Sequence, residues 1–341
     1  METNSTVQMN RVQSIDIVKG IAIICIILGH LDIPAVNKVV FTFNVPIFYF
    51  ISGYFINTKT DFRSFVKRKA RTLLVPYYIT SLVIIFFSML EGLQSGNALL
   101  NLKEWTYAAL YASGHTYTEP FYIKQIGAIW FLWATFWGAV FLRMTLNMKK
   151  THRIFTIAAL FTFGYLSKKW FWFPLSIQAG ACAAFFMYLG YLVQKEKQVL
   201  SLFSDESKHV ITIISLVVWL SFIIHFKSFW LVRCVISGVQ DIIGCICASY
   251  IVFLIARLIE EKIAGLGKVL AYIGKYSLLV LCIHIVELDM HLFSWTMFSF
   301  LNLSAVFQKA MTVAAKLIFD LFGAYVLSGF KFIRWMFGYR E

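Results

Sequence analysis

Three ionisable residues, Asp16, Lys19 and His30, interrupt the first apolar run of this chain of 341 residues. On an α-helix each residue advances by about 100°, so Lys19 and His30 project within about 20° of each other, and Asp16 within about 60° of both. Ionisable groups inside a bilayer are costly and usually mark a pathway or a site, so this stripe is the first candidate for chemistry. In the alternative interpretation, Asp16 and Lys19 form a paired anchor at one membrane edge and His30 lies at the other.

His30 is the residue of this stripe best suited to catalysis, because histidine accepts and returns a proton near neutral pH. A reaction in which a hydroxyl attacks needs such a base, since a hydroxyl is a weak nucleophile until its proton has a destination. We therefore predict a catalytic role for His30, with Lys19 and Asp16 stabilising a bound substrate or a polar channel. Asp16 lies about four turns from His30, so the group that orients His30 must come from another helix. A histidine hydrogen-bonded at the outer membrane face is the structural alternative.

A basic segment between residues 57 and 71 is a candidate site for a phosphorylated donor. Arg68 and Arg71 are three residues apart and share a face if the segment is helical, and Lys67 adds a third positive charge. Paired guanidinium groups bind phosphate in a bidentate manner, so this segment suits a ligand that carries phosphate. The charge alone also suits a topology anchor or a contact with anionic lipid.

Polar residues in the second apolar run, Asn44, Ser52 and Tyr54, are candidates for binding a substrate. Pro46 should kink this run and expose a backbone carbonyl. Further along the chain, Trp130 offers an aromatic face that can stack on a sugar ring. An aromatic belt at the membrane surface is the alternative interpretation of Trp130.

A late helix carries a second polar face, formed by Ser277, His284 and Glu287. This face suits either binding of the acceptor or a packed polar seam between helices. Asp241 and Asp320 are lone acids for which we predict an interior position and no further role. Nearly all of the six cysteines lie in apolar runs, and they show no zinc pattern, so we expect free thiols and no metal site.

The composition is that of a polytopic membrane protein. Hydrophobic residues make up 60% and charged residues 14% of the chain, against about 25% charged residues in soluble domains. A net charge of +14 would suit nucleic acid, but the basic residues cluster in short loops between apolar runs, as membrane topology requires. We therefore expect the lipid bilayer, and no nucleic acid, as a partner.

The apolar runs predict an all-α bundle of about ten transmembrane helices with both termini cytoplasmic. The whole chain, 1–341, is expected to form one membrane domain, with a polar leader at 1–14 and a basic cytoplasmic tail at 331–341. The predicted spans lie near 15–31, 39–56, 72–91, 126–146, 153–169, 174–194, 209–226, 240–258, 268–288 and 310–330.

The order and spacing of these groups resemble the membrane acyltransferase 3 family, over essentially the full chain. A basic residue separated from a histidine by ten residues, an R-x-x-R pair, a W-F-L helix and a late Gly-Ser-His helix all have counterparts here. The branch that the chain resembles most is the fucose 4-O-acetylase-like branch of sugar O-acetyltransferases. Two positions depart from that pattern. Asn44 stands where a histidine is common, which places more weight on His30, and Trp133 replaces a proline.

The resemblance implies a multi-pass O-acetyltransferase of the cell (inner, cytoplasmic) membrane. Acetyl-CoA would be the acyl donor, with no permanently bound cofactor, and a hydroxyl of a cell-surface glycan or its lipid-linked precursor would be the acceptor. The main alternative is a polytopic transporter or flippase for a glycan or small anion, although no repeat of broken helices between the two halves supports it. A non-catalytic scaffold, an amine acceptor and a longer acyl group are further alternatives.

Overall fold

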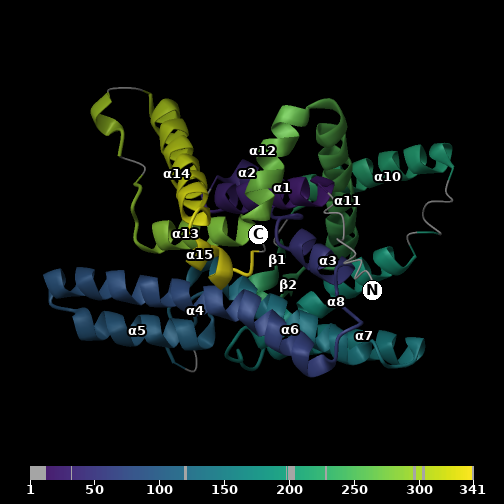
Figure 1. The fold of residues 1–341 in the computed structure, drawn as a ribbon, viewed down its shortest axis with the longest axis horizontal. Helices are drawn as coiled ribbons and strands as arrows, with labels where there is room; N and C mark the ends of the chain where they lie inside the picture. The colour runs from purple at the N-terminus through teal and green to yellow at the C-terminus, as the bar shows by residue number, and fades with distance from the viewer. Residues whose placement is uncertain are drawn as a thin grey trace, which may run out of the picture.

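The computed structural model describes residues 13–31, 33–118, 121–196, 198, 204–226, 229–294, 297–301 and 304–339. Helices dominate it, and the all-α class predicted from the sequence is confirmed (Figure 1). One short antiparallel pair joins β1 (Phe229–Trp230) to β2 (Val235–Ile236). The helices are α1 (Gln13–Gly29), α2 (Pro34–Val40), α3 (Pro46–Tyr54), α4 (Phe62–Ser95), α5 (Ala98–Tyr111), η1 (Gly127–Ile129), α6 (Trp130–Thr145), α7 (Lys150–Ser167), α8 (Ile177–Lys195), α10 (Asp205–Ile224), η2 (Leu231–Arg233), α11 (Val239–Lys262), α12 (Ala264–Lys275), α13 (Ser277–Asp289), η3 (Ser299–Leu301), α14 (Ala305–Ser328) and α15 (Lys331–Met336).

Within the described residues, six helices are long and apolar enough to cross a membrane, or up to seven if the bent pair α12 and α13 counts as one span. The predicted number of ten is therefore not confirmed. Helix α1 has 17 residues, and α7 begins with a basic turn that lowers its mean hydropathy. The predicted span at 39–56 is divided between two short helices, α2 and α3. Most of the predicted leader lies outside the described residues.

Proline explains why the second apolar run is divided. Pro34 and Pro46 each occupy the first turn of a helix, where a missing N–H costs nothing because that group has no partner within the helix. The expectation that Pro46 kinks a continuous span is wrong, because the chain turns between Phe41 and Val45 and starts α3 anew. The side-chain oxygen of Asn44 accepts a hydrogen bond of 2.8 Å from the backbone N–H of Val45 within this turn.

The basic segment is helical rather than a loop. Asp61 caps α4 by accepting a hydrogen bond of 2.8 Å from the backbone N–H of Ser64, so the helix begins at Phe62. Arg68 and Arg71 are exposed on its first turns. The guanidinium of Arg71 lies 4.8 Å from the centre of the Trp335 ring on α15.

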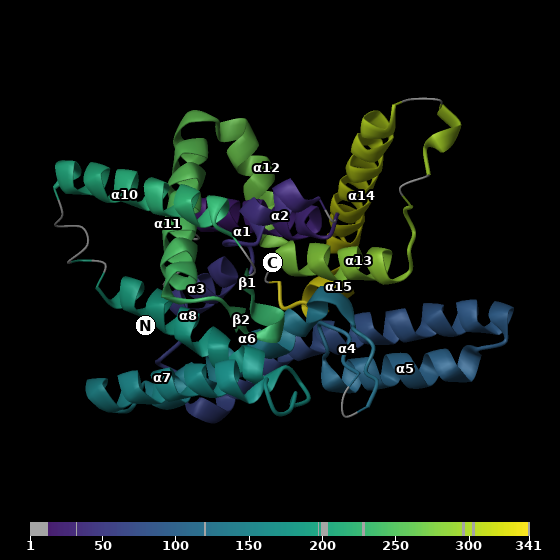
Figure 2. The same ribbon diagram turned by 180° about the vertical axis from the view of Figure 1, so that it is seen from behind.

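Helix α1 lies at the centre of the fold and packs against α12 (Figures 1 and 2). A Cβ atom at Gly20 would overlap the backbone carbonyl of Leu270, and one at Gly274 would overlap that of Asp16, so these glycines let the two backbones touch. The chain then bends by 70° between α12 and α13. This bend directs α13 across to α14, which it contacts, and brings His284 to the end of α1.

Candidate active site

His30 lies one residue beyond the end of α1 and is half-buried. Its Nδ1 is 2.9 Å from the backbone carbonyl oxygen of Ile26, one turn back along the chain. The same Nδ1 is 3.3 Å from Nε2 of His284, which comes from α13. The two rings are tilted by 48° with their centres 5.3 Å apart. A second imidazole, 254 positions away in the sequence, therefore orients His30.

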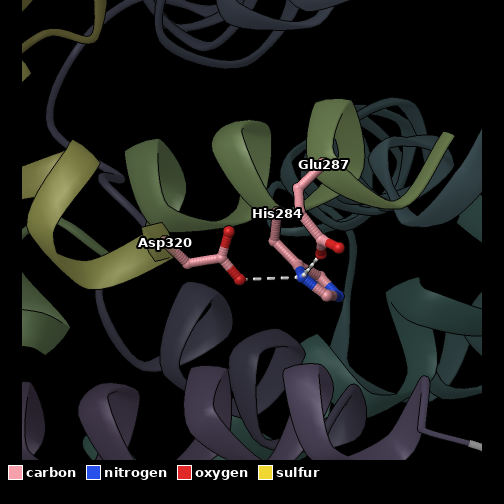
Figure 3. A group of neighbouring side chains, drawn as sticks. All are labelled: His284, Glu287 and Asp320. Carbon is pink, nitrogen blue, oxygen red and sulfur yellow. Dashed lines mark hydrogen bonds and ion pairs between the residues drawn. The ribbon is translucent and has the colours of Figure 1, made fainter. Parts of the chain in front are cut away.

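His284 is held from its other side by two carboxylates (Figure 3). Its Nδ1 lies 2.9 Å from Oδ2 of Asp320, on α14, and 3.4 Å from Oε2 of Glu287, one turn along α13. The side chains of all three residues are at most 1% exposed. Because a carboxylate oxygen only accepts when ionised, this contact places the proton of the neutral His284 ring on Nδ1 and leaves Nε2 as an acceptor facing His30.

The hydrogen-bond partners also assign the tautomer of His30. A backbone carbonyl accepts only, so Nδ1 of His30 carries the proton and donates it toward Ile26 and Nε2 of His284. This leaves Nε2 of His30 with a free lone pair. A nitrogen with a free lone pair is what a general base needs.

Lys316 completes the buried cluster. Its Nζ lies 2.9 Å from Oε1 of Glu287, and its side chain is 10% exposed. Each helix contributes two of these groups from one face. His284 and Glu287 are three residues apart on α13, and Lys316 and Asp320 are four residues apart on α14. Where α13 meets α14, the two helices therefore present all four groups to one another.

The same cluster offers donors of the kind that divalent cations bind. One atom each of His284, Glu287 and Asp320 lies within 4.8 Å of the others. These atoms already hold the Nδ1 proton of His284 and the ammonium of Lys316, which supply the positive charge that the carboxylates need. We therefore assign hydrogen bonds and ion pairs to this cluster, and the expectation of a site without metal stays a prediction.

A cavity of about 340 Å³ adjoins His30. This volume is at the lower end of the range for ligand pockets, about 300–1,000 Å³. Among the described residues, the lining contains no Asp, Glu, Lys or Arg, so the cavity carries no fixed charge, and most of its surface is apolar. The lining combines amide side chains with aromatic rings, including Asn37, Asn44, Gln125, Trp130, Phe131 and Trp230.

His115 also lines the cavity, from the segment between α5 and η1. Burial lowers the pKa of His115, and the nearby guanidinium of Arg233 lowers it further. The ring is therefore neutral at pH 7 and can donate one hydrogen bond and accept another.

The family of the chain follows from its sequence as a whole. Residues 12–333 match a family model described as an acyltransferase domain. This protein belongs to the acyltransferase 3 family. Together with its long apolar helices, this membership makes it a multi-pass membrane acyltransferase. No curated protein and no solved structure matches the chain.

In this acyltransferase, three of the residues predicted from the sequence lie together with His30. Asn44 and Trp130 line the cavity, where they are 4% and 6% exposed, and His284 lies directly behind His30. Glu287 belongs to the same cluster but does not line the cavity. The substrate-binding roles predicted for these residues stay predictions.

Other predicted residues lie elsewhere in the acyltransferase. Asp16 and Lys19 pair with each other at 3.4 Å near the start of α1, and neither lines the cavity. Ser52 and Tyr54 lie at the end of α3, where Gly53 allows close contact with the backbone of Met187 on α8. Ser277 begins α13, two turns before His284.

The exposed Arg68, Arg71 and Lys67 do not line the cavity either. They do lie at the end of the fold where α13 begins. Arg71 stacks on Trp335, and the hydroxyl of Tyr339, four residues later, accepts a hydrogen bond of 3.2 Å from the backbone N–H of Leu279. Helix α13 thus leads from the arginines to His284.

Asp320 and Lys316 are the residues of this cluster for which sequence reasoning assigned no role in a site. Both occur in an apolar helix, where an ionisable group is costly, and they stand one turn apart on one face. That spacing was the available signal. It does not identify the partner helix, because the partners lie about thirty positions earlier in the chain.

Proposed function

We propose that this membrane acyltransferase moves an acetyl group from acetyl-CoA to a hydroxyl of a neutral sugar unit in a cell-surface glycan or its lipid-linked precursor. The observation that carries the proposal is the placement of His30. Its Nδ1 is engaged by Ile26 and His284, and the ring lines a cavity of the size and chemistry that a sugar needs.

The lining of the cavity supports a neutral carbohydrate as the acceptor. Amide side chains such as Asn37, Asn44 and Gln125 donate to and accept from hydroxyl groups, while Trp130 and Trp230 provide aromatic faces. An acidic sugar or a phosphate would enter a lining of described residues that carries no cation to compensate it. This arrangement agrees with the fucose 4-O-acetylase-like branch that the sequence resembles.

The proposed chemistry is a single acyl transfer. The O–H bond of the acceptor breaks and its proton goes to Nε2 of His30, while the oxygen bonds to the thioester carbonyl carbon. The C–S bond then breaks, the ester remains on the sugar, and the coenzyme A thiolate leaves with the proton that Nε2 returns. No permanently bound cofactor is needed for these steps.

The donor is proposed to enter from the cytoplasm of a cell whose inner membrane holds the protein. Arg68 and Arg71, with Lys67, would bind the nucleotide phosphates, because guanidinium groups fit phosphate oxygens in pairs. The acyl-bearing arm would then follow α13 toward His284 and His30. From the start of α13 to His284 the helix rises by about 10 Å, a length that an extended pantetheine arm can cover.

The test is transfer of labelled acetyl groups by the purified full-length protein in detergent. The acceptors are the methyl glycosides of a neutral hexose, a neutral 6-deoxyhexose and a uronic acid, each assayed with acetyl-CoA. We expect acetyl esters on neutral sugars and at least tenfold slower transfer to the uronic acid. Failure to acetylate any carbohydrate, or a preference for the uronic acid, would overturn the proposal.

A further inference from the structure

We propose that His284 and Asp320 are positioning residues for the proton transfer at His30. In this inference, which rests on the proposed function, they hold His30 in the tautomer that leaves Nε2 free and stabilise the imidazolium that forms when Nε2 takes a proton. Neither residue touches the acceptor, and both act through the His30 ring.

The setting of Asp320 supports this role. Its carboxylate is completely buried, and its Oδ1 has no hydrogen-bond partner among the described residues. Oδ2 makes a contact of 2.9 Å with Nδ1 of His284. A buried carboxylate is costly, and here the compensating contact is the one that fixes the orientation and tautomer of His284.

The charge of the buried cluster supports it as well. The ammonium of Lys316 pairs with Glu287, which leaves the negative charge of Asp320 without a fixed cation among the four buried groups. While both imidazoles are neutral the cluster has one excess negative charge. Uptake of one proton by the histidine pair makes it neutral, which stabilises the protonated state that a general base must pass through.

The orientation of the two imidazole rings also supports this role. When Nε2 of His30 accepts a proton, its Nδ1 proton is directed at Ile26 and at the lone pair on Nε2 of His284. That lone pair exists because Asp320 keeps the His284 proton on Nδ1. A carboxylate behind a histidine does the same work in serine hydrolases, and here two imidazoles stand in line.

The groups that face His30 define what a pH profile would report. They are His284 on α13 and, behind it, Glu287 on α13 and Asp320 and Lys316 on α14; His115 lies across the cavity. Removing the charge of Asp320 should make the His30 imidazolium less stable. The acid limb of the rate profile should then move to lower pH.

The test compares Asp320→Asn with Asp241→Asn in the full-length protein. Asp241 is also a buried acid, but it accepts a hydrogen bond of 2.6 Å from the backbone N–H of Ser237 at the start of α11, away from the cluster. We expect Asp320→Asn to lower kcat by about 10²-fold or more, with KM changed less than about threefold. Asp320→Glu should recover part of kcat, and Asp241→Asn should keep kcat within about twofold.

A second variant keeps the inference falsifiable if Asp320→Asn does not fold. His284→Gln should lower kcat to a similar extent, and the double variant should lose little more, because residues that act as one unit are not additive. Equal kcat in Asp320→Asn and Asp241→Asn would overturn the inference, as would an effect on KM alone. A stoichiometric metal in the purified protein would overturn it too, because that ion would occupy Nδ1. If the wild-type protein transfers no acetyl group to a sugar, the proposed function itself is wrong.

Discussion

Two helices of this acyltransferase are each followed by a histidine with the same side-chain contact to the backbone, and yet the two histidines have very different surroundings. His30 follows the last residue of α1, and His225 follows the last residue of α10. In each case Nδ1 lies close to the carbonyl oxygen four residues earlier, at 2.9 Å from Ile26 and 2.8 Å from Ser221. The local hydrogen bond and the resulting tautomer are therefore shared by both helix ends.

The surroundings of the two rings differ completely. Most of α1 is buried, and His30 meets a second imidazole and a cavity. Helix α10 buries only Ser215 and Phe222 within the chain, and His225 is exposed. The comparison teaches that a histidine at a helix end becomes a candidate base through what packs behind it and what space lies before it.

The largest effect should come from removing the imidazole of His30. We expect His30→Ala to lower kcat/KM for acetyl transfer by about 10²- to 10⁴-fold, the usual contribution of a general base. The matched variant His225→Ala removes an imidazole with the same contact to the carbonyl four residues earlier and should keep kcat/KM within about twofold. Turnover by His30→Ala at the wild-type rate would mean that the two helix ends do not differ in function.

The next effect is on stability and tests the burial behind His30. Lys316→Met removes the ammonium partner of the buried Glu287, which should destabilise the fold by about 3–5 kcal/mol. Thermal unfolding in detergent measures this change. The double variant Lys316→Met/Glu287→Leu, which removes both charges, should regain most of the loss. No loss in the single variant would show that Glu287 is not held as a buried anion.

A smaller effect is expected at the other end of the fold. Arg71→Ala should raise KM for acetyl-CoA by about tenfold with little change in kcat, because it removes a charge-assisted contact to phosphate and leaves the base intact. Arg63→Ala, on the first turn of the same helix, is the control. An unchanged KM for the donor in Arg71→Ala would remove the arginine from donor binding.

The smallest effect concerns which histidine causes the acid limb of the pH profile. Burial and the guanidinium of Arg233 lower the pKa of His115. The ring therefore takes up a proton only at a more acid pH than an ordinary histidine does. His115→Gln should therefore leave the acid limb of kcat/KM where it is in the wild type, measured between pH 5.5 and 8 in steps of about half a unit. A shift of that limb in His115→Gln would assign the acid limb to His115 and not to His30.

The sequence predicted the helical class, because long apolar runs in a chain with few charges have no other stable form in a bilayer. The sequence also made His30 a candidate for catalysis, because an ionisable residue in an apolar run is costly and usually marks a site. The predicted number of ten spans, in contrast, is not confirmed. Whether a proline such as Pro46 kinks a helix or starts a new one depends on the turn before it, which composition does not describe.

The sequence by itself determined which residues can do chemistry, since side-chain type and helical spacing are local properties. Periodicity placed His284 with Glu287 on one face of α13, and the same spacing joins Lys316 with Asp320 on α14. Only the tertiary structure decided that α13 bends by 70° away from α12, meets α14 and brings His284 against His30. Such pairings between helices depend on packing of surfaces far apart in the chain, and no local pattern encodes which faces meet.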